Sequence, residues 1–276
     1  MAISAADVKK LREMTGAGMM DCKKALGKAN GDFEMAVEIL RKQGQKVSEK
    51  RADRDANQGL IITRVSDDGK KASAIEINSE TDFVARNEDF RAKATTFNNL
   101  VFDNSYKTLE EVLSSPFGNG TVADEVANMV GVIGEKIQIK KSLLLETDGT
   151  LVVYNHPGDQ LAVIVEFDGS VTNEDVAKDV AMQIAAMKPI AVTEAEVDAT
   201  VIEKEIEIAK EQLINEGRPA DIAEKAAKGK LRRFFEESVL LNQKFVKDNS
   251  VTVKQYLEQN NTPLVKAFYR LQLGES

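Results

Sequence analysis

Residues 78–90 read Asn-Ser-Glu-Thr-Asp-Phe-Val-Ala-Arg-Asn-Glu-Asp-Phe, and they join two segments of different periodicity. The preceding residues 72–78 alternate between two sets of side chains, as in a strand. One set is Ala72, Ala74, Glu76 and Asn78, and the other is Ser73, Ile75 and Ile77. In the following residues 86–102, Phe90, Ala94 and Phe97 recur at helical spacing. The stretch therefore predicts a strand-to-helix corner in a fold that contains both kinds of element.

Thr81, Asp82 and Phe83 occupy this corner. Thr81 and Asp82 are residue types that cap helices, because their side-chain oxygens accept hydrogen bonds from the free N–H groups of the first turn. The ring of Phe83 either packs on its own helix as a hydrophobic staple or protrudes into solvent. Phenylalanine is usually buried, so the pattern alone favours the staple.

Composition limits the class of protein. With 276 residues, of which 42% are apolar and 30% charged, the chain can form more than one soluble globular domain. No apolar run has the ~18 residues of a membrane span, and the N-terminus lacks a signal-peptide core. The single cysteine, Cys22, cannot form an intrachain disulfide, and its apolar neighbours predict a buried, inert thiol. We expect a cytoplasmic protein, and the net charge of −8 argues against a protein that coats nucleic acid.

Residues 1–44 have the pattern of three short helices. The glycines of residues 15–18 and the Asn-Gly-Asp of residues 30–32 separate them, and Gly44 is expected to end the third helix. Residues 45–58 are charged and almost free of apolar side chains, which predicts a solvated, partly helical linker. No aromatic residue is interleaved in this linker for base stacking, so we do not expect it to bind RNA.

The rest of the chain repeats one theme. Residues 59–78 and 151–166 each predict a β-hairpin, and each hairpin is followed by an amphipathic helix. The class is therefore α+β, with two related subdomains built on antiparallel sheets. Residues 193–236 interrupt the second subdomain with two long helices that reverse direction at residues 216–219 and so form an antiparallel helical hairpin. The predicted domains are a three-helix module (1–44), the linker (45–58), a core N-subdomain (59–146), a core C-subdomain (147–192 and 237–276) and the hairpin (193–236).

Two strings resemble the signatures of one family. Thr81-Asp82-Phe83-Val84 and residues 15–26, Thr-Gly-Ala-Gly-Met-Met-Asp-Cys-Lys-Lys-Ala-Leu, are similar to the two signatures of the elongation factor Ts family. Residues 134–141 and 242–246 resemble further family strings, in the family's order, so the resemblance covers nearly the whole chain.

The resemblance implies a ubiquitin-associated-like N-terminal module, two core subdomains, and a hairpin that protrudes or forms a homodimer. It implies a guanine-nucleotide exchange factor that binds elongation factor Tu with GDP and promotes GDP release, so that GTP can bind. Asp82 and Phe83, with Thr81 and Val84, would act near the Mg²⁺ and nucleotide of Tu. The residues that the resemblance places in contact with Tu are Arg12, Met19, Met20, His156, Phe245 and Val246.

For three of these residues, the sequence also allows an ordinary structural role. One of Met19 and Met20 could fill the small core of the module, whereas an exposed pair would form an adaptable apolar contact surface. His156 precedes Pro-Gly and could simply be a turn residue.

The residue types argue against an active site of the chain's own. The single histidine and single cysteine fall in different predicted domains, and no Gly-x-x-x-x-Gly-Lys-Ser/Thr phosphate loop or zinc-ligand spacing occurs. We therefore expect no enzyme activity, no cofactor and no metal, and no direct binding of nucleotide, nucleic acid or membrane. The alternatives from other classes are a chaperone-like adaptor with an exposed apolar groove and an RNA-binding protein with steep salt dependence.

Overall fold

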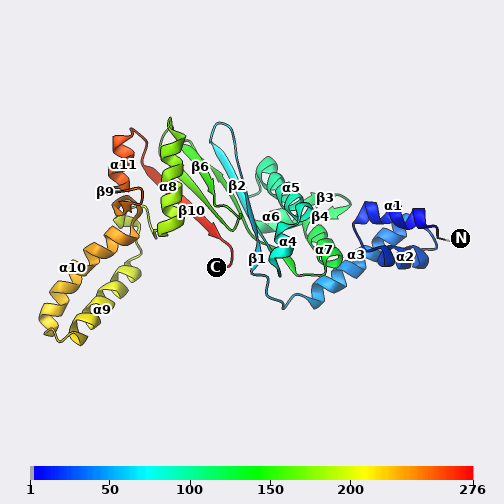
Figure 1. Ribbon diagram of the computed structural model, residues 1–276, viewed down its shortest axis with the longest axis horizontal. Coiled ribbons are helices and arrows are strands. Elements are labelled where there is room, and N and C mark those ends of the chain that lie inside the picture. The colour runs from blue at the N-terminus through cyan, green and yellow to red at the C-terminus, as the bar shows by residue number, and fades with distance from the viewer. Residues whose placement is uncertain (1–2, 276) are drawn as a thin grey trace.

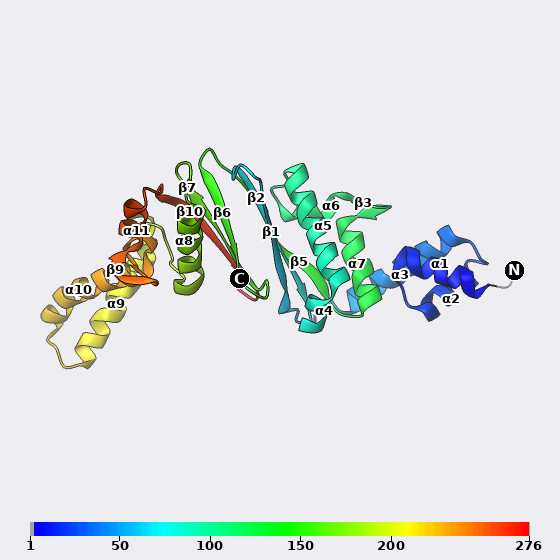
Figure 2. The ribbon, with the colours of Figure 1, turned by 45° about the horizontal axis from the view of Figure 1, so that its top comes forward.

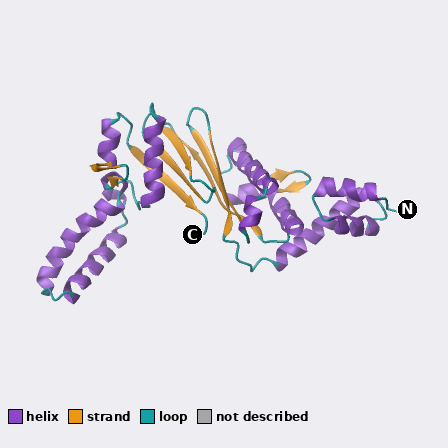
Figure 3. Cartoon of the chain, in the orientation of Figure 1, coloured by secondary structure: helices purple, strands orange, loops and turns teal. Residues whose placement is uncertain are grey.

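The computed structural model describes residues 3–275, apart from the side chains of residues 220 and 221. The molecule is elongated: the chain runs along it from the N-terminal module to the helical hairpin of residues 199–238 and then returns, so that the C-terminus lies near the middle (Figure 1). The three-helix module lies at one end, two β-sheets lie in the middle, and a helical hairpin projects from the other end (Figures 1 and 3).

The N-terminal module contains α1 (Ala5–Thr15), α2 (Met19–Lys28) and the first half of α3 (Phe33–Lys50). Ser4 and Asp7 form a capping box at the start of α1, and Asp32 caps α3 through the N–H of Met35. The module encloses its own core of buried side chains, which includes Leu11, Leu26, Ala36, Leu40 and the fully buried Cys22. The predicted burial of the Cys22 thiol is confirmed.

Helix α3 continues past Gly44, so the prediction that this glycine ends the helix is wrong. Gly44 is buried in the middle of α3, where the helix crosses α7 (Val122–Ile133). Beyond the crossing, Val47 packs on the core of the first subdomain. The segment predicted as a linker therefore begins as a helix that is docked on the core as far as Lys50, and residues 51–57 are non-helical.

The first sheet has the strand order β1–β2–β5, with all pairs antiparallel. Its strands are β1 (Gln58–Val65), β2 (Lys71–Ser79) and β5 (Ile137–Glu146). One face carries Ile75 and Ile77 into a core with Phe90, Phe97 and Val126. The elements on this side are α4 (Asp82–Arg86), α5 (Glu88–Asn104), α6 (Leu109–Ser114), α7 and the short strands β3 (Pro116–Phe117) and β4 (Gly120–Thr121).

The second sheet has the order β10–β7–β6 and is also antiparallel. It consists of β6 (Thr150–Asn155), β7 (Leu161–Phe167) and β10 (Val265–Gln272). Val163 and Val165 face a core with Val180 and Ile184 of α8. The other elements of this half are α8 (Glu174–Met187), η1 (Glu194–Glu196), η2 (Leu240–Asn242), β8 (Lys244–Phe245), β9 (Asp248–Thr252) and α11 (Val253–Gln259).

The two sheets pack on each other in the centre of the molecule, with helices on both outer sides (Figure 2). The side chains between the sheets are small or branched, as at Ala72, Ala74, Ala162 and Ile164. Because β2 and β7 are central strands between a sheet and a helix layer, both of their faces are buried. This arrangement confirms the predicted α+β class with two antiparallel sheets.

The hairpin consists of α9 (Ala199–Asn215) and α10 (Ala220–Ser238). Ala209, Leu213, Ala223 and Ala227 form its narrow buried seam. The predicted direction reversal at residues 216–219 is confirmed, with Gly217 at a positive φ of 86°. The domain boundaries as a whole stay predictions, and their outer ends at residues 1–2 and 276 lie outside the described residues.

Candidate functional site

The corner at residues 81–84 exposes one large apolar side chain. Strand β2 ends at Ser79, and the single-turn helix α4 starts at Asp82. Phe83 is 80% exposed, the most exposed of the large apolar side chains described, whereas Val84 is partly buried against the core below. Of the two sequence interpretations, the staple is wrong for the free chain and the protruding ring is what the structure has.

Neither predicted cap is made by the predicted side chain. The Thr81 hydroxyl donates to Glu135 Oε1 at 2.7 Å instead of accepting from α4. Asp82 pairs with Arg86 one turn later, at 2.9 Å, and its side chain stays 40% exposed. Helix α5 starts separately at Glu88, because the Asn87 side chain accepts from the N–H of Phe90 and caps it.

Two carboxylates outside α4 hold the corner. Glu135 Oε2 accepts from the N–H of Thr81 at 2.9 Å, and Glu80 Oε1 accepts from the N–H of Lys136 at 2.6 Å. Arg51 donates to the same oxygen of Glu80 at 2.7 Å. The Lys136 N–H and the nearby Arg51 lower the pKa of Glu80, so this carboxylate is ionised at neutral pH.

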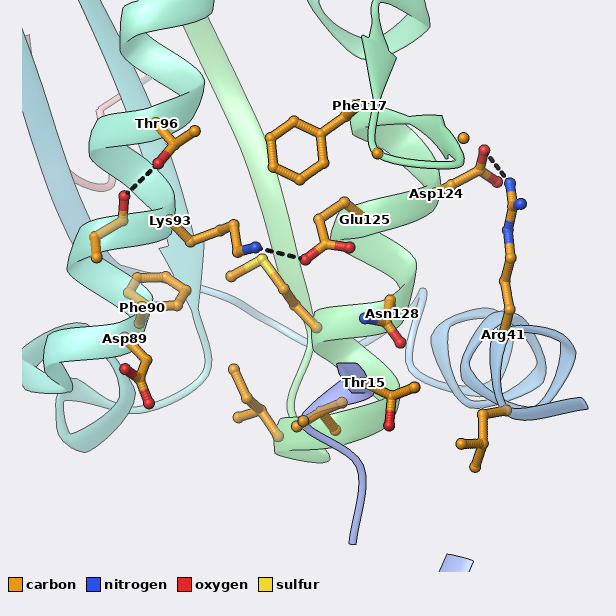
Figure 4. A pocket seen from close by; sticks show the side chains of 18 of the residues that line it. Thr15, Arg41, Asp89, Phe90, Lys93, Thr96, Phe117, Asp124, Glu125 and Asn128 are labelled. Carbon is orange, nitrogen blue, oxygen red and sulfur yellow. Dashed lines mark hydrogen bonds and ion pairs between the residues drawn. The ribbon is translucent and has the colours of Figure 1, made fainter. Parts of the chain in front are cut away.

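An apolar groove of about 1050 Å³ lies between the N-terminal module and the first subdomain (Figure 4). Phe83 and Val84 line it together with Met14, from the end of α1, and Val132 and Ile133, from the end of α7. Its walls also carry polar side chains, and Figure 4 shows Lys93 pointing toward Glu125 across the groove, at 2.8 Å. The exposed ring of Phe83 and residues of the N-terminal module therefore line the same groove.

The module exposes the three residues singled out from the sequence. Met19 is 46% and Met20 is 62% exposed, so the alternative of one buried core methionine is wrong. Arg12 is exposed near the end of α1 and pairs with no acidic side chain among the described residues. Met14, which the sequence analysis missed, is 59% exposed and belongs to the same apolar surface as the groove.

The remaining predicted residues lie in the second half of the chain: Phe245 and Val246 at β8, and His156 in the β6–β7 turn, whose Asp159 pairs with Arg91 of α5. Phe245 is only 2% exposed and stacks on Tyr256 with ring centroids 3.9 Å apart, so its ring supports the segment and does not form its surface. Val246 is 44% exposed. His156 is an exposed residue of the β6–β7 turn, with Nδ1 2.9 Å from the Tyr154 hydroxyl. The ordinary turn role therefore accounts for its position.

Glu80, Glu135 and Arg51 are the residues of the corner that the sequence analysis missed. Glu80 lies in the stretch of residues 78–90 and Glu135 in the family string of residues 134–141, but neither pattern indicates what their side chains contact. Their role depends on the pairing of Ser79 with Ile137, which brings two distant segments together.

Among the side chains that the structure describes, no cluster of three or more His, Cys, Asp or Glu residues could hold a metal ion. None of the helices described there combines the length and apolar character needed to cross a membrane.

Residues 80–275 match the family model described as Elongation factor TS. The chain belongs to the elongation factor Ts family. It is 46% identical to the elongation factor Ts of Christiangramia forsetii over 274 residues, covering 99% of both chains. It is 44% identical to that of Nitratiruptor sp., covering 100% of this chain and 94% of the relative. With the elongation factor Ts of Porphyromonas gingivalis it shares 39% identity over 99% of both chains. The resemblance seen in the two signature strings is thereby confirmed over the full length.

Proposed function

We propose that the chain is a guanine-nucleotide exchange factor of translation elongation that acts in the cytoplasm on elongation factor Tu. It binds Tu with GDP, promotes the release of GDP and stabilises the nucleotide-free state so that GTP can bind. It carries out no chemical step of its own and binds no nucleotide directly. The observation that carries the proposal is the exposed ring of Phe83 on a corner that the surrounding side chains hold in place.

The mechanism rests on reciprocity between two binding equilibria. A protein that binds the empty GTPase more tightly than the loaded one must weaken nucleotide binding by the same factor when it docks. Phe83 is the wedge: inserted between elements of the GTPase domain, it moves the switch region away from the nucleotide. The ring of Phe83 is 80% exposed, and covering it with a partner lowers the free energy of the complex, which favours this docking.

Asp82 contributes charge next to the wedge. Its side chain is 40% exposed, and its carboxylate can exchange Arg86 for a partner in Tu. A carboxylate brought close to the bound Mg²⁺ disturbs the waters and side chains that hold the ion. Without Mg²⁺, the GDP phosphates repel one another and their binding weakens. Thr81 and Val84 complete the wedge segment by fixing its two ends to the core.

Two further areas anchor Tu. Arg12, Met19 and Met20 form an exposed surface on the module, and methionine side chains adapt to irregular partners. On the second subdomain, Val246 and the segment supported by Phe245 form the other anchor. His156, in the β6–β7 turn, is a separate contact next to the first subdomain. The binding free energy of both anchors offsets the strain that the wedge introduces in Tu.

The experiment is the release of a fluorescent GDP analogue from Tu, in Mg²⁺, with the chain added at substoichiometric amounts. Multiple-turnover acceleration is expected, and Phe83→Ala should reduce it by about tenfold or more without changing the fold. The matched control is Ile190→Ala, which removes an exposed apolar side chain of the loop after α8 and should leave release unchanged. Absence of acceleration by the folded wild-type chain would overturn the proposal.

A further inference from the structure

The corner that carries Phe83 is closed by a reciprocal pair of carboxylates. Glu80 precedes the corner and accepts from the backbone N–H of Lys136, whereas Glu135 precedes β5 and accepts from the backbone N–H of Thr81. Each strand end thus donates a backbone N–H to an acidic side chain of the other. This exchange continues the β2–β5 ladder beyond its last pair, Ser79 with Ile137.

A third element holds the same corner. Arg51 is the C-cap residue of α3, and it donates to Glu80 at 2.7 Å. The Lys136 ammonium donates in turn to the carbonyls of Ala52 and Arg54, at 2.7 and 2.8 Å. The residues at and just after the end of α3 are therefore hydrogen-bonded to Glu80, which follows β2, and to Lys136, which precedes β5.

The first residues of the corner, before Phe83, have few contacts within α4 that fix their position. Helix α4 has five residues, and its N-cap makes no side-chain hydrogen bond. Phe83 is mostly exposed, so packing in the free chain does not restrain its ring. Val84 and Ala85 hold the later residues of α4 on the core, whereas the backbone of residues 80–82, which leads into Phe83, is restrained by the two carboxylates and Arg51.

These hydrogen bonds are of the strong kind. The donors meet ionised or charged partners at 2.6 to 2.9 Å, in the range of charge-assisted hydrogen bonds. The side chains of Glu80 and Arg51 are 19% and 33% exposed, so water competes with them only in part.

We propose that Glu80, Glu135 and Arg51 are positioning residues for the wedge: they hold the corner so that Phe83 meets its partner in the orientation that opens the nucleotide site. This inference rests on the proposed exchange function. A wedge that is preformed loses little conformational freedom on docking, and more of the docking free energy is left for displacing the partner's elements. A chain with a loose corner would still bind Tu through the two anchors, but Phe83 would displace the elements of the GTPase domain less effectively.

A merely structural role and a positioning role differ in the kinetics. If the three residues only stabilise the fold, their loss lowers the melting temperature and leaves the exchange rate per folded molecule unchanged. If they position Phe83, their loss lowers the maximal rate of GDP release, while the half-saturating concentration changes little because the anchors remain.

The test compares Glu135→Ala and Glu80→Ala with the wild-type chain in the GDP-release assay, over a range of concentrations of Tu with GDP. Each alanine variant should lower the maximal rate by about tenfold, with less than about a threefold change in half-saturation. Glu80→Gln and Glu135→Gln should recover most of the rate, because the amide oxygen can still accept the backbone N–H. Glu110→Ala is the control, since Glu110 is an exposed glutamate whose side chain pairs with none of the described residues.

A second measurement does not involve Tu. Amide hydrogen exchange of Thr81 and Lys136 should be slow in the wild-type chain and faster in the matching alanine variant, because these are the N–H groups that the carboxylates accept. In addition, combining Glu135→Ala with Phe83→Ala should slow release no further than Phe83→Ala alone.

The outcomes separate the inference from the proposed function. If the wild-type chain accelerates release and the folded alanine variants match it, the positioning role is overturned while the exchange function stands. Additive effects of Glu135→Ala and Phe83→Ala, or glutamine variants as slow as the alanine variants, overturn it as well. If the wild-type chain does not accelerate GDP release, the proposed exchange function itself is overturned, whatever the amide hydrogen exchange shows.

Discussion

Gly44 of α3 and Gly131 of α7 touch backbone to backbone where the two helices cross: a Cβ atom on Gly131 would lie 2.5 Å from the Cα of Gly44. A Cβ atom on Gly44 would lie 3.2 Å from the carbonyl oxygen of Ala127. Beside this crossing, Arg41 of α3 pairs with Asp124 of α7. The crossing is the direct connection between the N-terminal module and the core, and it admits no side chain at Gly131.

We expect Gly131→Ala to loosen this crossing. Alanine gains about 1 kcal/mol over glycine in helix propensity, but forcing helices apart costs about 1–3 kcal/mol, so the module should detach more readily. Limited proteolysis within α3 should become faster, and the midpoint of urea unfolding should fall. Gly229→Ala in α10 is the control, because nothing lies within 4 Å of its added Cβ, and it should raise stability. Equal proteolysis of Gly131→Ala and the wild type would contradict the prediction.

Helix and strand positions followed from the sequence because periodicity and caps are local properties. Both hairpins, the helix after each and the helical hairpin were predicted. Gly44 was misjudged because a glycine before a charged run is typical of a helix end, whereas here it permits a close crossing with a helix almost 90 residues away in sequence. Such a contact leaves no local signal on either helix.

At the candidate site, the exposure of Phe83 could not be obtained from its own pattern. Phenylalanine is usually buried, and only the family resemblance indicated a protruding ring. The carboxylates of Glu80 and Glu135 were missed because their partners are backbone N–H groups more than 50 residues away. Phe245 lies in a matching string, yet its ring is buried by Tyr256. Similarity of a string identifies a segment but not which of its side chains face outward.

Removal of residues 1–44 should weaken binding to Tu and leave the core folded. The deletion takes away the exposed surface of Arg12, Met19 and Met20 as well as the Gly44 crossing, while Val47 still packs on the first subdomain. We expect affinity for nucleotide-free Tu to fall by about tenfold or more, measured by titration calorimetry. A truncated chain that shows no cooperative thermal unfolding would contradict the independence of the core.

Tyr256 should give the chain an alkaline pH dependence. Burial and the hydrogen bond that its hydroxyl donates to Asp179 raise its pKa from 10.0 to about 12. Because the folded-state pKa is the higher one, this contribution to stability is complete below pH 10 and is lost as the pH rises toward 12. Tyr256→Phe should therefore be about 1 kcal/mol less stable than the wild type at pH 8, with the difference vanishing near pH 12.

Urea unfolding at several pH values between 8 and 12 measures this difference. The free energy of unfolding of the variant is subtracted from that of the wild type at each pH, which cancels the contribution of other groups that titrate in the same range. Tyr106→Phe is the control and should keep the full alkaline loss, because the Tyr106 hydroxyl pairs with none of the described side chains. A constant difference between Tyr256→Phe and the wild type over the whole range would show that the hydroxyl does not titrate as expected.

The helical hairpin should pair two copies of the chain. Its own seam is narrow, and Ile208, Ile214 and Ile222 stay 38%, 43% and 46% exposed on a projecting element. Covering three such side chains contributes several kcal/mol at most, so we expect a weak dimer with a dissociation constant in the micromolar range or above. Sedimentation velocity should show a concentration-dependent coefficient that Ile208→Glu combined with Ile222→Glu abolishes, because a charge in the interface is costly to desolvate. If the sedimentation coefficient of the wild-type chain keeps the value of a monomer at all concentrations, the hairpin is instead a free protrusion.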